Sequence, residues 1–331
     1  MIEAFVFGKF LPFHKGHEAM VRFALTRCDR LTILVCCSDR ERVPASRRVR
    51  WINQTFIAEK RLKIEVLNYR EHDLPNTSVS SRTVSEAWSN TFKKMLPEVS
   101  LLITSEPYGD FVAEYMGIHH IPFDLERHLT PVSATAIRAD LFQNWSYLPD
   151  AVKSDFAIKV ALSGTESTGK STIAKRLADH FHGTLVDEAG RELIPNSNHF
   201  TMDDLDNVAH AHTQRIRASL CGNSPLIFLD TTVHTTISYG QFFFGKLLEA
   251  SEEMLELNRP HICLYSTKDA PFIQDGTRLS AYERNELDRS HRDILQIHQI
   301  PIIEISGSWE ERYESAKQTV SVFLKHHVQI F

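Results

Sequence analysis

The sequence predicts an α/β protein that consists of two doubly wound parallel-sheet domains. Apolar segments of strand length recur along the chain and alternate with segments of helical periodicity. This alternation starts twice, because a strand, a glycine-containing turn and a helix follow one another near residue 8 and again near residue 164. The length of 331 residues suits two domains of ordinary size.

The predicted strands form two series. The first series comprises residues 2–8, 31–37, 64–69 and 100–105, and the second comprises residues 157–164, 183–188, 225–230, 261–266 and 301–306. Helical patterns separate them, for example at residues 18–28 and 171–181. Between the two series lies a connector, Phe142–Ala157, which contains a proline and several aromatic residues. We therefore predict a first domain at residues 1–145 and a second at residues 155–331.

Composition excludes several classes of protein. A net charge of −5 gives no electrostatic basis for general nucleic-acid binding, although local basic clusters could still bind phosphates. No apolar segment is long enough to span a membrane, and the N-terminus starts as a strand without a basic region. The 5 cysteines fit no zinc or disulfide framework. These features predict a cytoplasmic protein.

The strongest motif is GTESTGKS, which spans Gly164–Ser171 and matches the P-loop pattern. A predicted strand precedes it and a predicted helix follows it, as the motif requires. Backbone N–H groups of such a loop and the helix N-terminus form an anion cradle. Lys170 can reach the β- and γ-phosphates, and the Ser171 hydroxyl can ligate Mg²⁺. The other residues predicted to bind nucleotide here are Gly164, Thr165, Glu166, Ser167, Thr168, Gly169 and Thr172.

Acidic residues follow two later strands. Asp187 and Glu188 end the strand segment GTLVDE, and Asp230 ends PLIFLD. The carboxyl ends of parallel strands line the site in a doubly wound sheet, so one acid can orient Mg²⁺ and another can accept a proton from an attacking hydroxyl. A solvated acid at the start of a loop is the alternative. Arg278 lies in an Arg-rich segment that is either a lid over the phosphates or a solvated surface.

The first turn, GKFLPFHKGH, contains His14 and His17 and allows several readings. A zinc site needs a third ligand, and the nearby His119 and His120 offer no clear one. A core or capping histidine, a plain turn and a dinucleotide loop with the wrong spacing are further readings. The remaining reading is phosphate recognition by imidazoles at a helix N-terminus. The residues predicted to bind nucleotide beside them are Gly8, Lys9 and Phe10.

A second segment favours phosphate recognition. TPVSATAIRADL, at Thr130–Leu141, carries Ser133 and Thr135 at a predicted helix start and Arg138 about one turn later. Hydroxyl groups at this position cap the helix and donate hydrogen bonds, and an arginine one turn on can face the same phosphates.

These paired segments resemble the nucleotidyltransferase superfamily, whose marks are HxGH and a Ser/Thr-rich motif that ends in Arg. The form GKFxPxHxGH resembles the nicotinamide mononucleotide (NMN) adenylyltransferases. Together with CCSDRERVPASRRVRWI, SEPYGDFVAEYMG, DEAGRE, FLDTTVHTT and DGTR, they resemble the NadR-type bifunctional proteins from residue 3 to about residue 325. The resemblance implies a Rossmann-like HxGH nucleotidyltransferase domain followed by a P-loop kinase domain. The sequence does not contain the N-terminal helix-turn-helix that some members of this family carry, so no repressor role is expected.

The resemblance implies two consecutive reactions. The second domain would phosphorylate nicotinamide riboside with ATP to give NMN, with Lys170 and Ser171 on the phosphates and Mg²⁺, and Asp230 at the metal. Asp187 or Glu188 would position or deprotonate the hydroxyl, and Arg278 would stabilise the moving phosphoryl group.

The first domain would join NMN to the AMP part of a second ATP, which gives NAD and pyrophosphate. His14 and His17 would contact the ATP phosphates, and Lys9 and Arg138 would hold the departing β- and γ-phosphates. Trp51 is either a stacking partner for a substrate ring or a core residue, and Arg47 and Arg50 are candidate substrate neighbours. The expected ligands are ATP, nicotinamide riboside, NMN, NAD and Mg²⁺, without nucleic acid or membrane. The sequence does not fix the oligomeric state, and a homo-oligomer is compatible with it.

Two departures from the family pattern keep alternatives open. Ala134 replaces a serine of the adenylyltransferase motif, and Thr232 stands where the kinase half often has a second acid. The second hypothesis is therefore a nucleotide-sensing or regulatory protein with an inactive kinase half. A third is an enzyme with the same two folds and another acceptor. The Nudix signature is absent, so pyrophosphate hydrolysis is not expected.

Overall fold

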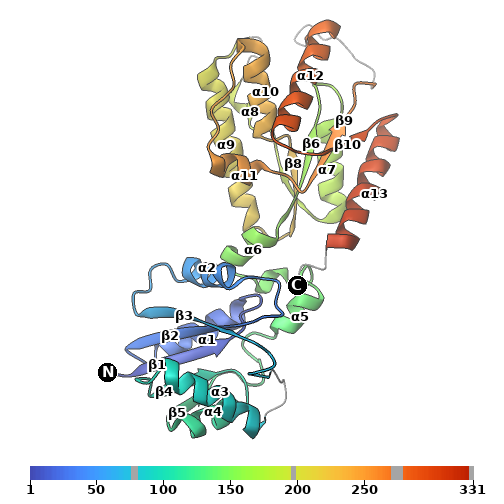
Figure 1. The fold of residues 1–331 in the computed structure, drawn as a ribbon. Helices are drawn as coiled ribbons and strands as arrows, with labels where there is room; N and C mark the ends of the chain where they lie inside the picture. The colour runs from blue at the N-terminus through green and yellow to red at the C-terminus, as the bar shows by residue number, and fades with distance from the viewer. Residues whose placement is uncertain (76–80, 195–198, 270–278, 328–331) are drawn as a thin grey trace. The chain divides into compact units, whose positions relative to one another are not determined.

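The computed structural model divides the chain into two compact units, one formed by Met1–Asp155 and a second that starts at Phe156. It describes residues 1–75, 81–194, 199–269 and 279–327. The division falls inside the predicted connector, and each unit is built around one sheet (Figure 1). Within the described ranges, no helix has both the length and the apolar character needed to cross a bilayer.

The first unit has a sheet of five parallel strands in the order β3-β2-β1-β4-β5. The strands are β1 (Glu3–Gly8), β2 (Arg30–Ser38), β3 (Leu62–Tyr69), β4 (Leu101–Thr104) and β5 (His119–Pro122). The helices are α1 (Lys15–Leu25), α2 (Ala45–Thr55), α3 (Arg82–Met95), α4 (Gly109–Met116), α5 (Ala134–Ala139) and α6 (Asp150–Phe156). The chain order reverses between β1 and β4, and ligands of doubly wound sheets bind beyond the carboxyl ends of the strands at such a point.

The four strands predicted for this unit are confirmed, whereas β5 was not predicted. This strand has the sequence HHIP and none of its residues is fully buried, because it lies at the edge of the sheet. His120 ties it to β4, since its Nε2 lies 3.0 Å from Thr104 Oγ1 and its Nδ1 lies 2.7 Å from Asp110 Oδ1. His120 thus has partners within the fold that the sequence did not reveal.

The second unit also has five parallel strands, in the order β10-β9-β6-β8-β7. The strands are β6 (Ile158–Ser163), β7 (Thr184–Val186), β8 (Leu226–Asp230), β9 (Ile262–Ser266) and β10 (Ile302–Ile305). The helices are α7 (Lys170–Phe181), α8 (Gly190–Leu193), α9 (Met202–Leu220), α10 (Val233–Phe244), α11 (Glu252–Asn258), α12 (Ala281–Ile297) and α13 (Trp309–His327). All five strands predicted for this half are confirmed, and the two-sheet α/β fold with them.

Burial explains why these segments form inner strands. Every residue of β6, β8 and β9 is buried, as expected for parallel strands covered by helices on both faces. Because β6, β8 and β7 are neighbours, the segments that follow them meet at one edge of the sheet. These segments are the P-loop, the end of β8 at Asp230, and the turn that carries Glu188. The fold therefore gathers the residues that the sequence singled out in the second half.

Candidate active sites

The P-loop of the second unit connects β6 to α7 in a conformation that depends on two glycines. Gly164 has φ of 128° and Gly169, the N-cap of α7, has φ of 82°. A Cβ on Gly164 would lie 2.5 Å from the carbonyl oxygen of Ser266, so a side chain is excluded there on two grounds. The glycines of the predicted motif thus meet a backbone requirement, and the loop leads directly into the N-terminus of α7.

Lys170 is the first residue of α7 and lies over the loop. Its Nζ donates a hydrogen bond of 2.7 Å to the carbonyl oxygen of Thr165, which also accepts one of 2.8 Å from Thr168 Oγ1. Burial lowers the pKa of Lys170 below its usual range, and the nearby carboxylates of Glu188 and Asp230 oppose that shift. A lysine ammonium that donates to a neutral carbonyl oxygen can readily exchange this partner for phosphate oxygens.

Two carboxylates face Lys170. Asp230, at the end of β8, is 1% exposed, and neither of its carboxylate oxygens accepts a hydrogen bond from a described residue. Burial raises the pKa of Glu188 above its usual range, against the opposing effect of Lys170. A carboxylate with raised proton affinity is a suitable proton acceptor, and a buried carboxylate without hydrogen bonds is a suitable cation ligand.

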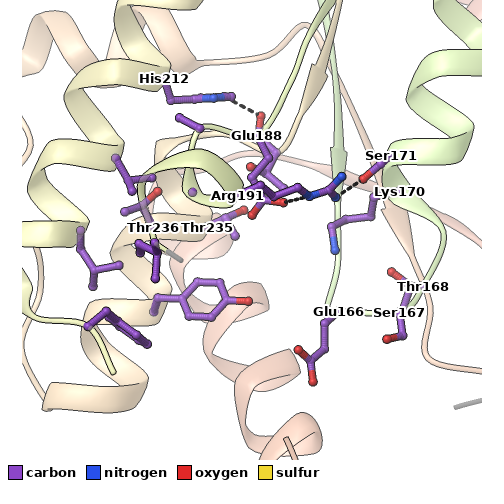
Figure 2. A pocket seen from close by; sticks show the side chains of 18 of the residues that line it. Glu166, Ser167, Thr168, Lys170, Ser171, Glu188, Arg191, His212, Thr235 and Thr236 are labelled. Carbon is purple, nitrogen blue, oxygen red and sulfur yellow. Dashed lines mark hydrogen bonds and ion pairs between the residues drawn. The ribbon is translucent and has the colours of Figure 1, made fainter. Parts of the chain in front are cut away.

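A cavity of about 450 Å³, which is a size that suits a small-molecule ligand, lies beside Lys170 and Glu188. One side is lined by the consecutive P-loop residues Glu166–Thr172 and by Glu188 (Figure 2). The other side is partly apolar and is formed mainly by α9, α10 and the segments that precede α9. Residues of this side include Ile194, Phe200, Leu205, Val208, Thr236 and Tyr239. The cavity therefore has a phosphate-binding end and an end suited to a flat organic group.

Other predicted residues of this unit lie differently. Asp187 does not line the cavity, and its carbonyl oxygen accepts a hydrogen bond from Arg215. The buried Thr232 is also outside the cavity lining, with its hydroxyl 3.0 Å from His234 Nδ1. Arg278 lies outside the described residues.

In the first unit, His14 is the N-cap of α1 and His17 lies in the first turn of that helix. Their rings are stacked, with centroids 3.7 Å apart. Burial lowers the pKa of His14 to about 3, and burial also lowers the pKa of His17 well below its usual range. Both rings are therefore uncharged at neutral pH, because burial disfavours the charged imidazolium form.

The tautomer of His14 follows from its hydrogen bond. Its Nδ1 accepts from the Gly16 N–H at 3.1 Å, so the proton of the neutral ring sits on Nε2. Nε2 is then a donor, and it stands at the N-terminus of a helix where anions are stabilised. The capping reading and the phosphate reading of His14 are thus compatible. Among the described residues no group of three His, Cys, Asp or Glu side chains could hold a metal, so a third ligand for a zinc site is not found there.

Arg138 joins the two segments that the sequence paired. Its guanidinium donates a 2.6 Å hydrogen bond to the carbonyl oxygen of Leu11 in the β1–α1 loop and a 3.0 Å bond to Thr135 Oγ1. Ser133 caps α5, since its hydroxyl accepts from the Ala136 N–H at 3.1 Å. The loop with the two histidines and the start of α5 therefore lie side by side, which is the arrangement that the proposed phosphate site requires.

A cavity of about 390 Å³ opens beside this site. Gly8, Lys9, Thr135 and Arg138 line its polar side, and Trp88 and Tyr108 line its aromatic side. Phe10, which the sequence grouped with Gly8 and Lys9, is buried, and its ring centroid lies 4.9 Å from that of His17. The polar side thus stands next to an aromatic wall that is suited to a heteroaromatic ring.

Lys9 is held in place by acidic residues. Its Nζ lies 2.9 Å from Glu41 Oε1, and the other oxygen of Glu41 lies 2.7 Å from the fully buried Arg48. Arg48 in turn donates a 3.0 Å hydrogen bond to the carbonyl oxygen of Lys9. The Lys9 side chain is partly exposed, so an anion can approach it.

Three further residues that the sequence singled out have partners within the fold. Trp51 is fully buried and its Nε1 donates a 2.7 Å hydrogen bond to Asp155, so it is a core residue and does not stack on a substrate. Arg50 also bonds Asp155, and Arg47 lies 3.7 Å from it. The structure thus gives these two arginines a partner within the fold.

Sequence reasoning missed several site residues. Trp88 and Tyr108 belong to no phosphate motif, and a tryptophan on an amphipathic helix reads as core. Arg127 lowers the pKa values of both His14 and His17 through its charge, and a loop arginine gives no sequence signal of this. In the second unit, His212 and Tyr239 line the cavity from α9 and α10. The sequence shows only that they belong to helical segments.

Known proteins show similarity to this chain over nearly its whole length. A family model described as an AAA domain matches residues 159–312. The trifunctional NAD biosynthesis/regulator protein NadR of Escherichia coli (strain K12) is 28% identical over 94% of this chain and 79% of its own length. NadR of Salmonella typhimurium is 27% identical over 91% of this chain and 78% of its own length. The chain is a homologue of the NadR proteins.

Further comparisons bear on each unit. A nicotinamide-nucleotide adenylyltransferase of Ignicoccus hospitalis is 28% identical over 40% of this chain and 75% of its own length. A crystal structure of NadR protein in complex with NR has a TM-score of 0.66 at 21% identity, and the match covers 97% of this chain and 95% of that one. The fold of the NadR proteins therefore extends across both units.

Proposed function

We propose that the chain is a bifunctional enzyme of NAD salvage. In the second unit it phosphorylates nicotinamide riboside with ATP, and in the first it joins the resulting NMN to the AMP part of another ATP. The observation that carries the proposal is the presence of one anion-binding strand-to-helix turn in each unit, each beside a cavity with a flat, apolar or aromatic side. Homology to NadR over 94% of the chain supports the same assignment.

In the kinase unit, the 5′-hydroxyl oxygen of the riboside attacks the γ-phosphorus, the bond to the β-phosphate oxygen breaks, and ADP leaves. Glu188 takes the hydroxyl proton, since it lines the cavity and has raised proton affinity, whereas Asp187 does not line the cavity. Lys170 binds the β- and γ-phosphates from the helix N-terminus. Homology to NadR over 94% of the chain does not favour the alternative of an inactive kinase half.

We propose Mg²⁺ as the cofactor of this unit, and the residues present fit it. Ser171 and Asp230 would hold the ion, because Mg²⁺ prefers oxygen ligands and Asp230 offers a buried carboxylate that no described residue hydrogen-bonds. Since no group of three candidate ligands occurs in the described ranges, phosphate oxygens and water would complete the shell. When bound, the ion would neutralise charge on the β- and γ-phosphates.

In the adenylyltransferase unit, a phosphate oxygen of NMN attacks the α-phosphorus of ATP, the α–β bridging bond breaks, and pyrophosphate leaves. No enzyme nucleophile is needed, so catalysis is positioning plus charge stabilisation. His14 and His17 donate hydrogen bonds to the α-phosphate region, and Lys9 and Arg138 hold the departing phosphates. Trp88 and Tyr108 form the wall against which the nicotinamide ring packs.

A time course tests the proposed function. The full chain is incubated with nicotinamide riboside, excess ATP and Mg²⁺, and NMN and NAD are followed by chromatography. NMN should appear first and NAD second, with ADP and pyrophosphate released in matching amounts. If riboside-dependent ADP release does not occur, the regulatory alternative is favoured and the kinase assignment is wrong.

The aromatic wall gives a separate prediction. Trp88→Ala should raise the KM for NMN in NAD formation by roughly 10- to 100-fold, because stacking of a base on an aromatic side chain contributes about 1–3 kcal/mol. Trp88→Phe, which keeps a ring and the packing, should raise it less. Phosphorylation of nicotinamide riboside by the same variants is the control and should not change. An unchanged KM for NMN in a folded Trp88→Ala variant would remove Trp88 from the substrate site.

A further inference from the structure

Arg191 lies on the short helix α8 and reaches into the proposed magnesium site. Its guanidinium donates a hydrogen bond to Ser171 Oγ, and the same group lies 3.3 Å from Asp230 Oδ2. Its Nε lies 3.2 Å from Glu188 Oε2 (Figure 2). One guanidinium thus contacts both proposed metal ligands and the proposed base. No sequence motif and no role in the mechanism above had assigned it this position.

The charges around Arg191 explain why it lies there. Asp230 is almost fully buried, and its ion pair with Arg191 is the one that the described residues provide. Lys170, the other nearby cation, donates its hydrogen bond to a loop carbonyl oxygen instead of to either carboxylate. Two close carboxylates in a buried site repel each other and need a counter-ion. Arg191 supplies that positive charge in the protein without ligand.

We infer that Arg191 is a resident cation that occupies the metal position of the nucleotide-free kinase unit and leaves it when the metal enters. The inference rests on the proposed function, since it assumes the magnesium site at Ser171 and Asp230. Mg²⁺ binds oxygen ligands at about 2.0–2.1 Å with near-octahedral geometry. A guanidinium in contact with the same hydroxyl and carboxylate oxygens leaves no room for such an ion. Occupancy by Arg191 and by the metal is therefore mutually exclusive.

The exchange of Arg191 for the metal ion also affects the cavity that would bind the acceptor. Its side chain is 59% exposed, so it can swing away from the carboxylates into solvent or toward phosphates without leaving a cavity in the core. Three neighbours on the same short segment, Ala189, Gly190 and Ile194, line the cavity. Arg191 itself also lines the cavity, so its departure from the carboxylates changes the shape and charge of the cavity next to these residues. Metal binding and acceptor binding are then coupled, and by linkage each strengthens or weakens the other by the same factor.

The test measures metal binding without turnover. The full chain is titrated with Mn²⁺ in the absence of nucleotide, and free Mn²⁺ is read from its electron paramagnetic resonance signal. Arg191→Gln should bind Mn²⁺ roughly tenfold or more tightly than the unaltered chain, which is within the usual range of coupling between sites. Arg191→Lys keeps the positive charge but loses the planar guanidinium. Its affinity for Mn²⁺ should lie between the affinities of the unaltered chain and of Arg191→Gln.

Two further variants make the result specific. Arg217→Gln removes an arginine of a comparable exposed ion pair, with Glu253, that is not part of the cavity, and it should bind Mn²⁺ as the unaltered chain does. Asp230→Asn in the Arg191→Gln background should abolish the gained affinity. The inference is overturned if folded Arg191→Gln binds Mn²⁺ no more tightly than the unaltered chain, or if the gain survives Asp230→Asn. A gain that depends on Asp230 in a chain without kinase activity would uphold this inference while the proposed function fails.

Discussion

Replacing Lys170 with alanine should reduce formation of NMN from nicotinamide riboside and ATP by at least about 100-fold, while conversion of NMN to NAD is unchanged. Lys170 is the cation at the start of α7, and its Nζ donates a hydrogen bond to the carbonyl oxygen of Thr165. Loss of one preorganised donor to developing charge in a buried site commonly costs 10²- to 10³-fold in rate. The measurement is the initial rate of ADP release that depends on the riboside.

Lys175→Ala is the matched control for this substitution. Lys175 lies on the same helix, and it is exposed. The control variant should retain the kinase rate of the unaltered chain. If Lys170→Ala also abolished NAD formation from NMN in a folded protein, the two reactions would share one site and the assignment of separate sites would be wrong.

The second large effect is expected at His17. His17→Ala should lower the rate of NAD formation from NMN by roughly 10²- to 10³-fold and leave riboside phosphorylation intact. The ring of His17 stacks on His14, and its Nδ1 is buried without a hydrogen-bond partner among the described residues. A neutral imidazole in this position can donate a hydrogen bond to a phosphate oxygen as charge builds up on the α-phosphorus.

His72→Ala is the control for His17→Ala, because the side chain of His72 is 96% exposed on the same unit. The control should have both activities at full rate. A folded His17→Ala variant that still forms NAD at close to the normal rate would contradict phosphate recognition by this histidine and favour the core reading of its ring. The same two assays on Arg138→Ala would show whether the segment Thr130–Leu141 also acts in NAD formation from NMN.

The sequence predicted the backbone features of the candidate phosphate sites because these features depend on local residue types. The P-loop needs glycines in particular backbone conformations, and Gly164 and Gly169 have positive φ angles as such a loop requires. The pairing of the two segments of the first unit also followed from residue types, since Arg138 can serve the phosphates only if it approaches the histidine loop. The hydrogen bond from Arg138 to the carbonyl oxygen of Leu11 places the arginine at the histidine loop, as this pairing requires.

What the sequence did not reveal depends on tertiary contacts. The edge strand β5 is short and none of its residues is fully buried, so it has no hydrophobic pattern. Trp51 and Trp88 are both helical tryptophans, and only the packing shows that Trp51 bonds Asp155 whereas Trp88 lines a cavity. Arg191 belongs to the DEAGRE segment, but the sequence does not show that Ser171, Glu188 and Asp230 converge on it.

In the kinase cavity, the residues that would bind ATP and those that would bind the acceptor come from different parts of the chain. The triphosphate end is built from one continuous loop, Glu166–Thr172, whereas the opposite wall comes from side chains such as Phe200 and Tyr239 on other elements. Evolution or design can therefore alter the acceptor wall without disturbing the loop that binds ATP. Acceptor preference in this scaffold is a variable that can drift or be engineered independently of donor recognition.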